Sequence, residues 1–218
     1  IFGAGPVPAF GIVGAAWAAT ISQWGAAAVA MGVVRRRIGI APRVQWHAVR
    51  ALFVVGRDLI VRTGLLLCFL ALATRMALQM GAAAGAAHQA LRQIWMLTAF
   101  LLDAYAVAAQ SLVSAAIGRR DYALARQVAA VACRWSVGTG AVLAVLMWWG
   151  ESLVLAVLVP PSAHLVCAGA WGPTVWAQPL NALSFATDGV HWGTGDYRYL
   201  RNAMGGATLV CGVGVCTV

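Results

Sequence analysis

The sequence contains no lysine and few charged residues of any kind. Its 218 residues include 15 basic side chains, all of them arginine, and 6 acidic ones, so that only 10% of the chain is charged while 62% is hydrophobic. Soluble domains are about a quarter charged and about half apolar. This composition excludes a soluble domain with a large core and predicts an all-α, polytopic transmembrane helix bundle.

The shortage of acids leaves the chain with a net charge of +9. The arginines lie in short clusters between apolar runs, whereas a nucleic-acid-binding protein gathers its basic residues on one folded face. Cytoplasmic loops of membrane proteins collect basic residues for topological reasons. We therefore read the positive charge as a topology signal and expect no nucleic-acid partner.

Sequence signatures of covalent chemistry are also lacking. The five cysteines lie mostly within apolar runs, without a CxxC pair or a metal-ligand spacing to histidine, and we interpret them as small apolar fillers. There is no P-loop, no HExxH and no nucleophile elbow. These absences argue against an ATP-driven pump, an intramembrane protease or another enzyme, and we expect no metal site and no cofactor.

Six apolar stretches have lengths typical of membrane spans, which need about 20 residues. They cover 9–34, 51–80, 86–117, 127–149, 165–193 and 202–218. The longest polar interruption, 35–50, carries five arginines and predicts a linker between two halves. No initiator methionine is present and the last stretch runs to the final residue, so we expect a piece of a longer chain.

The connections between these stretches alternate in charge. Arginine occurs in 35–50, 118–126 and 195–201, whereas 81–86 and 150–164 contain neither lysine nor arginine. The positive-inside rule places the first three connections in the cytoplasm. In GRRDYALAR (118–126) and GDYRYLR (195–201), the acidic residues are expected to cap helices and to pair with arginines, and the arginines to contact anionic lipid.

One polar stripe interrupts the fifth apolar stretch. Asn181, Ser184, Asp188 and His191 fall at helical positions i, i+3, i+7 and i+10, on one face, and Pro179 predicts a kink near its start. An ionised carboxylate in hydrocarbon is costly unless it is paired or hydrated, so an intramembrane aspartate marks a candidate functional site. The structural alternative for Asp188 is an aspartate hydrogen-bonded to a neighbouring helix or paired with arginine.

A second acid lies near the centre of the third apolar stretch. Asp103 has Gln110 at i+7 on the same helix face and, with Asp188, predicts a two-carboxylate site whose titrations are coupled. Its structural alternative is a salt bridge to an arginine such as Arg62. Aromatic residues Trp95, Trp176 and Trp192 could stack on flat cations in a cavity, although we favour an interfacial belt for all three.

Several motifs together resemble one transporter family. RDLIVRTGLLL (57–67), AAHQALRQIW (86–95), LDAYAVAAQSLVSAAIGRRDYALAR (102–126), QPLNALSFATDGVHWGTGDYRYL (178–200) and IFGAGPVPAFGIVGAAWAAT (1–20) resemble the DinF-like branch of the multidrug and toxic compound extrusion (MATE) family. The resemblance implies helices six to eleven of twelve. Residues 1–34 would then end the amino-terminal lobe, 35–50 would link the lobes, and 51–218 would form the carboxyl-terminal lobe without its last helix.

This resemblance also implies a function. A protein similar to the MATE family would be an antiporter. It would export cationic or amphipathic compounds in exchange for protons or sodium ions, by alternating access. Asp188, Asp103, Asn181, Ser184 and Gln110 are the residues that would line the ion and substrate cavity. We expect the protein to be a monomer in contact with lipid, in a bacterial-type inner (plasma) membrane. The main protonatable aspartate of this branch lies on a first helix that the sequence does not include.

Two alternatives and one departure from the family pattern remain. Ser114 and Ala115 stand where the family more often has a glycine-containing run. A flippase for a lipid-linked precursor has a similar two-lobed fold but would have a broad cationic cavity, which Asp103 and Asp188 argue against. The other alternative is a non-transporting membrane scaffold or a truncated product.

Overall fold

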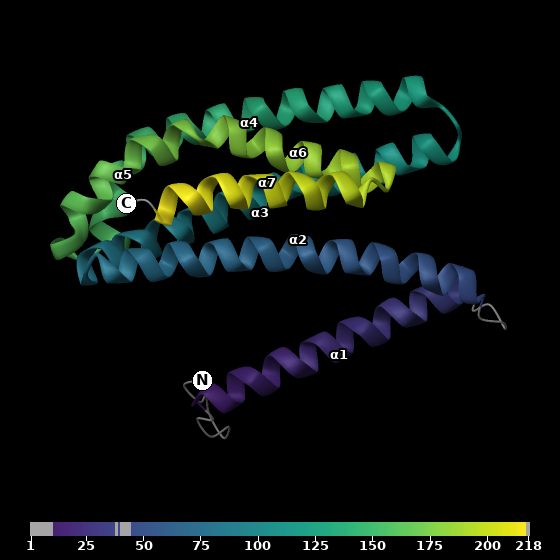
Figure 1. The fold of residues 1–218 in the computed structure, drawn as a ribbon, viewed down its shortest axis with the longest axis horizontal. Coiled ribbons are helices and arrows are strands. Elements are labelled where there is room, and N and C mark those ends of the chain that lie inside the picture. The colour runs from purple at the N-terminus through teal and green to yellow at the C-terminus, as the bar shows by residue number, and fades with distance from the viewer. Residues whose placement is uncertain (1–10, 38, 40–44, 217–218) are drawn as a thin grey trace. The chain divides into compact units, whose positions relative to one another are not determined.

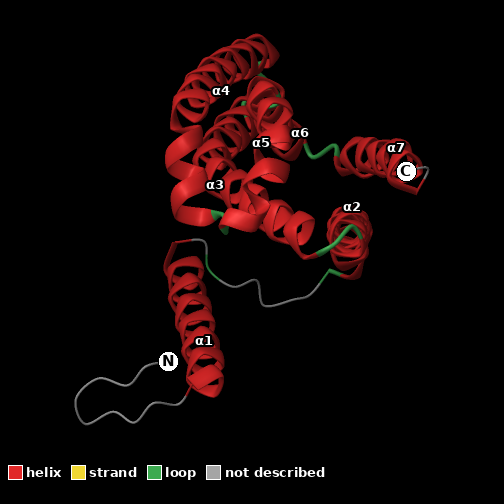
Figure 2. Cartoon of the chain, turned by 90° about the vertical axis from the view of Figure 1, so that its left-hand side faces the viewer, coloured by secondary structure: helices red, strands yellow, loops and turns green. Residues whose placement is uncertain are grey.

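A computed structural model describes residues 11–37, 39 and 45–216, and these are almost entirely helical (Figure 1). Figure 2 shows helices and loops and no strand among the described residues, which confirms the predicted all-α class. The helices are α1 (Gly11–Arg37), α2 (Trp46–Gln79), α3 (Ala82–Gly118), α4 (Tyr122–Leu158), the short 3-10 helix η1 (Pro161–Ala163), α5 (His164–Trp176), α6 (Gln178–Thr194) and α7 (Tyr197–Cys216).

Two compact units divide the chain, Ile1–Ala51 and Leu52–Val218. In the first unit, α1 is an apolar helix with no buried residue among those described. The predicted linker 35–50 is partly helical, because α1 continues through Arg37 and α2 begins at Trp46. The rest of that linker, at 38 and 40–44, and the predicted entry segment 1–8 lie outside the described residues.

Four helices of the described chain are long and apolar enough to cross a membrane: Gly11–Arg37, Val49–Gln79, Ala82–Gly118 and Tyr122–Leu158. Six spans were predicted, and the first four agree. The sixth predicted span corresponds to α7, whose first turns (YRYLRN) are polar. The fifth predicted span is divided, and neither α5 with 13 residues nor α6 with 17 spans hydrocarbon alone.

The division falls at Ala177, two residues before the predicted kink at Pro179. Pro173 lies inside α5 and Pro179 in the first turn of α6. Because proline has no N–H, neither residue donates to the carbonyl four positions earlier, and two backbone hydrogen bonds are lost close to Ala177. The result is a discontinuous helix in the middle of the apolar sequence.

Connections between the long helices are shorter than predicted. The arginine-containing segments 118–126 and 195–201 are mostly helical, since α4 begins at Tyr122 and α7 at Tyr197. Asp121 caps α4 by accepting from the Leu124 N–H at 2.9 Å, and Asp196 caps α7 by accepting from the Tyr199 N–H at 3.2 Å. Both predicted caps are therefore confirmed.

Helices of the second unit run alternately up and down. Figure 1 shows the α3–α4 and α6–α7 turns at one end of the bundle and the α2–α3 turn with η1 at the other. Short turns between long helices enforce this antiparallel order. The two turns that carry arginine thus share one end, as the charge pattern predicted, whereas which membrane face that end occupies stays a prediction.

Small residues bring α3, α4 and α6 close together. A Cβ on Gly189 of α6 would lie 2.2 Å from the Ala106 carbonyl oxygen of α3, and one on Gly140 of α4 would lie 2.7 Å from the Ala182 Cβ of α6. Ser136 of α4 donates to the Ala182 carbonyl oxygen at 2.7 Å. Close backbone approach and interhelical hydrogen bonds are what hold helices together in lipid. These contacts fix α6 against its two neighbours.

Gly189→Ala is expected to destabilise the protein strongly, because the added methyl group meets the backbone of α3 rather than a movable side chain. Overpacking of this kind costs roughly 1–3 kcal/mol or more. Thermal unfolding in detergent, followed by size-exclusion fluorescence, measures the loss. Gly138→Ala on α4 is the matched control, since nothing lies within 4 Å of its added Cβ; an equal loss in both variants would contradict close packing at Gly189.

Candidate functional site

A cavity of about 620 Å³ lies between α2, α3, α6 and α7. All five predicted site residues line it: Asp103 and Gln110 from α3, and Asn181, Ser184 and Asp188 from α6. The face of α6 is presented to α3 because Gly189 permits close approach of the two backbones. The structure therefore brings together residues that are up to 85 positions apart in the sequence.

Asp188 is paired with an arginine from another helix. The Arg62 guanidinium of α2 donates to the Asp188 carboxylate of α6. Both side chains are partly buried, with 16% of the Arg62 side chain and 33% of the Asp188 side chain exposed. The structural alternative for Asp188, an arginine partner, is thus observed, and the pair joins α2 to α6 within the cavity wall.

Asp103 has no such partner. Among the described residues it forms no ion pair, and the proposed alternative of a bridge to Arg62 is wrong because Arg62 pairs with Asp188. The cavity wall therefore holds two carboxylates and one guanidinium, which leaves one acid uncompensated. Asp103 is exposed, and a carboxylate without a counter-ion attracts a cation.

The polar stripe predicted for α6 lines this wall with one exception. Asn181, Ser184 and Asp188 line the cavity, whereas His191 does not. The imidazole of His191 stacks on Tyr199 of α7 with a centroid distance of 4.2 Å. At 100° per residue His191 projects within about 20° of Ser184, so helix rotation does not remove it from the stripe; its ring is taken up by the contact with Tyr199 instead.

Two tryptophans lie in the cavity wall rather than in the belt we favoured. Trp95 of α3 and Trp192 of α6 line the cavity. Trp176 behaves as predicted for an exposed aromatic: it is 74% exposed and makes an edge contact with Trp148 at a centroid distance of 6.4 Å. The cavity thus offers indole faces as well as carboxylates, a combination that suits flat organic cations.

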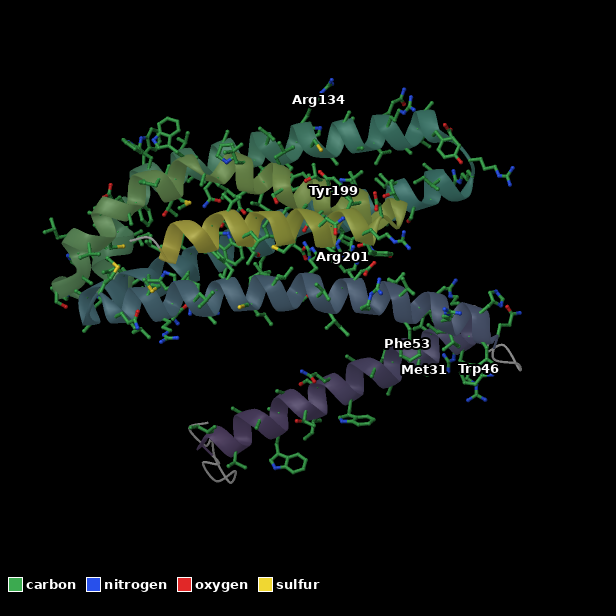
Figure 3. The ribbon with its side chains drawn as sticks, in the orientation of Figure 1. Met31, Trp46, Phe53, Arg134, Tyr199 and Arg201 are labelled. Atoms are coloured by element: carbon green, nitrogen blue, oxygen red, sulfur yellow. The ribbon has the colours of Figure 1, made fainter. Side chains whose placement is uncertain are left out.

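Helix α2 supplies charged residues whose place in the site was not predicted, since Arg62 was named only as a possible partner of Asp103 and Asp58 was given no role. Arg62 supplies the counter-ion of Asp188, and one helical turn earlier Asp58 pairs with Arg201 of α7 at 2.8 Å and with its neighbour Arg57 at 3.1 Å. Asp58 is buried, with 2% of its side chain exposed. Two charged residues spaced i, i+4 inside an apolar stretch were the available signal. Figure 3 shows Arg201 between α7 and α2.

No group of three or more histidine, cysteine, aspartate or glutamate side chains arranged to hold a metal ion occurs in the part of the chain that the structure describes. The site chemistry available here is therefore that of carboxylates, one guanidinium, amides and aromatic rings. Carboxylates and aromatic rings are the groups with which proteins bind cationic ligands.

Comparison with known proteins now identifies the family. The MatE family profile matches residues 59–218. The chain belongs to the MatE family. The match covers every residue of the cavity wall, and with the four apolar helices it makes the chain a multi-pass membrane protein.

Curated relatives come from a plant. The chain is 31% identical over 206 residues to Protein DETOXIFICATION 44, chloroplastic, and 29% identical over 202 residues to Protein DETOXIFICATION 45, chloroplastic, both of Arabidopsis thaliana, with 89% of this chain aligned in each case. Protein DETOXIFICATION 42 of the same plant is 30% identical over 193 residues, or 87% of this chain. These alignments span only 35–38% of the relatives' own lengths. No solved structure gives a significant match.

Proposed function

We propose that this MatE-family chain forms part of a secondary active antiporter that exports cationic or amphipathic small molecules in exchange for protons or sodium ions. The observation that carries the proposal is the cavity wall, in which Asp103 and Asp188 lie with Arg62, Trp95 and Trp192. A cationic compound and a coupling ion would compete there for the carboxylates. Exchange of this kind needs no cofactor beyond the coupling ion.

Alternating access requires two lobes that rock against each other. We propose that 1–34 ends the amino-terminal lobe, that 35–50 links the lobes, and that 51–218 is the carboxyl-terminal lobe, corresponding to helices six to eleven of a twelve-helix, DinF-like transporter. The discontinuous α5–α6 segment supports this placement, because broken helices line the binding sites of many transporters.

The same proposal extends to location. We place the connections 35–50, 118–126 and 195–201 on the cytoplasmic face of a bacterial-type inner (plasma) membrane, with the protein acting as a monomer among lipids. Two relatives, both from Arabidopsis thaliana, are named as chloroplastic proteins. A flippase for a lipid-linked precursor is less well supported, since the cavity carries an excess of acid rather than of base.

Asp103→Asn is expected to weaken binding of a flat aromatic monocation such as ethidium about 10-fold, because it removes the carboxylate that has no ion-pair partner. Dye fluorescence with the purified, full-length transporter that contains this chain measures the affinity. Glu151→Gln on α4 is the matched control, since Glu151 lies outside the cavity wall. Equal affinities for the Asp103 variant and the unaltered protein would contradict a role for Asp103 in cation binding.

A further inference from the structure

A second cavity, of about 650 Å³, adjoins the first one. It lies between α2, α3, α5 and the start of α6, and both cavities have Leu66, Trp95 and Asn181 in their walls. Pro173 and Ala177, at the division between α5 and α6, belong to the second wall. The break in the helix therefore faces this cavity. The shared residues show that the two cavities are adjacent.

The charge of the second wall is opposite to that of the first. No acidic side chain lines it, whereas the basic residues Arg92 and His88 of α3 do, with His88 Nε2 hydrogen-bonded to Thr74 Oγ1 at 3.2 Å. Phe69 and Trp95 supply aromatic faces, and most of the remaining lining side chains are apolar. A cation in this compartment would meet an arginine and no carboxylate. The second cavity therefore disfavours a cation, and its aromatic and amide side chains match a neutral aromatic group.

Two amide side chains in this wall present unpaired polar atoms. Gln178 is buried, with 1% of its surface exposed, and its Oε1 has no hydrogen-bond partner, while its Nε2 donates to the Thr174 carbonyl oxygen at 3.4 Å. The buried Nδ2 of Asn181, one helical turn later, also has no partner. Buried polar atoms are nearly always paired in proteins. One acceptor and one donor therefore point to a ligand group that carries both.

We infer that the second cavity is a subsite for an aromatic carboxamide, or a similar group with adjacent donor and acceptor, on a ligand whose cationic end lies at Asp103 and Asp188. The carboxamide N–H donates to Gln178 Oε1, and its carbonyl oxygen accepts from Asn181 Nδ2. The inference rests on the proposed function for the first cavity. It adds a selection rule: this protein prefers monocations with a neutral hydrogen-bonding aromatic end over dications.

The spacing along α6 sets the length of such a ligand. Asn181 and Asp188 are seven residues apart, about 10 Å along the helix axis. A para-substituted benzene ring with a carboxamide at one end and a short dimethylaminoalkoxy chain at the other spans that length. Its ring would then lie beside Leu66 and Trp95, which belong to both walls.

Binding of three matched probes to the purified full-length transporter tests the subsite. The probes are 4-(3-dimethylaminopropoxy)benzamide, the matching methyl benzoate, which lacks the N–H donors, and the matching benzamidine, which carries a second positive charge. The benzamide is expected to bind about 3- to 10-fold more tightly than the ester. The benzamidine is expected to bind more weakly than both, because its amidinium meets Arg92.

Variants separate the subsite from general effects on folding. Gln178→Met removes the unpaired acceptor and keeps an unbranched side chain, so it should abolish the preference for the benzamide, leave ester binding unchanged and keep or raise thermal stability. Arg92→Gln should reduce the difference in affinity between the benzamide and the benzamidine, because it removes the guanidinium that repels the amidinium. Gln89→Met, at an exposed position of α3 outside both walls, is the control and should change nothing.

The possible failures are distinguishable. Equal binding of the benzamide and the ester to the unaltered protein would overturn the subsite and leave the cation site of the first cavity standing. A preference for the benzamide that survives Gln178→Met would overturn the assignment to Gln178. Absence of binding by all three probes, and by ethidium, would overturn both the subsite and the proposed function.

Discussion

Replacing Asp188 with asparagine is expected to reduce ion-driven dye efflux roughly 30-fold or more, because the change removes a carboxylate that we propose substrate and coupling ion share, and it leaves Arg62 without a partner. Inverted membrane vesicles carrying the full-length transporter, energised first by a proton gradient and then by a sodium gradient, measure the efflux. The gradient that drives the unaltered protein identifies the coupling ion.

Loss of efflux alone does not separate a binding role from a structural one, since an unpaired, partly buried arginine also destabilises the fold. The double variant Arg62→Leu, Asp188→Leu removes both charges and should recover much of the thermal stability that Asp188→Asn loses. We expect efflux to remain absent in this stable double variant. Efflux that returns together with stability would show that Asp188 serves only to hold α2 against α6.

The second large effect is expected at the other ion pair of α2. Arg201→Leu should lower the midpoint of thermal unfolding by roughly 5–15 °C, because it leaves the buried Asp58 carboxylate with only the exposed Arg57 as partner. This pair is a principal link between α2 and α7 in the structure. Size-exclusion fluorescence of heated, detergent-extracted protein gives the midpoint.

Arg134 provides the matched control for that experiment. It is exposed on α4 and points away from the neighbouring helices in Figure 3, so Arg134→Leu should leave the midpoint nearly unchanged. A similar fall for both arginines would mean that the effect comes from added surface hydrophobicity or lost charge in general. In that case Asp58 and Arg201 would not hold α7 in place.

Much of the architecture was predictable because hydrophobic spans and helix caps are local signals. Each of the first four spans is a continuous apolar stretch of the sequence, and the caps Asp121 and Asp196 depend on residues within one turn. Helix ends were less predictable, since arginine-containing segments such as 118–126 remain helical once the apolar stretch has ended. Polarity marks where a helix leaves the hydrocarbon and does not mark where its hydrogen bonding stops.

The candidate site was predictable in part for the same reason. The polar stripe on α6 and the pair Asp103 and Gln110 on α3 follow from helical periodicity, which places each set on one face. Periodicity says nothing about which helices become neighbours. An arginine partner for Asp188 was therefore predicted, but not that this arginine is Arg62. The second cavity depends on the break at Ala177 and on long-range packing, and no local pattern indicates it.

The most direct test of the central claim, that cations and the coupling ion compete for Asp103 and Asp188, is a titration of ethidium binding to the purified full-length transporter. Protons and then sodium ions are added to the unaltered protein and to the double variant Asp103→Asn, Asp188→Asn. Release of the dye from the unaltered protein by one of the two ions, together with weak, ion-independent binding by the variant, is the expected result. Tight dye binding by the variant, with the same ion dependence as the unaltered protein, would contradict the proposed site.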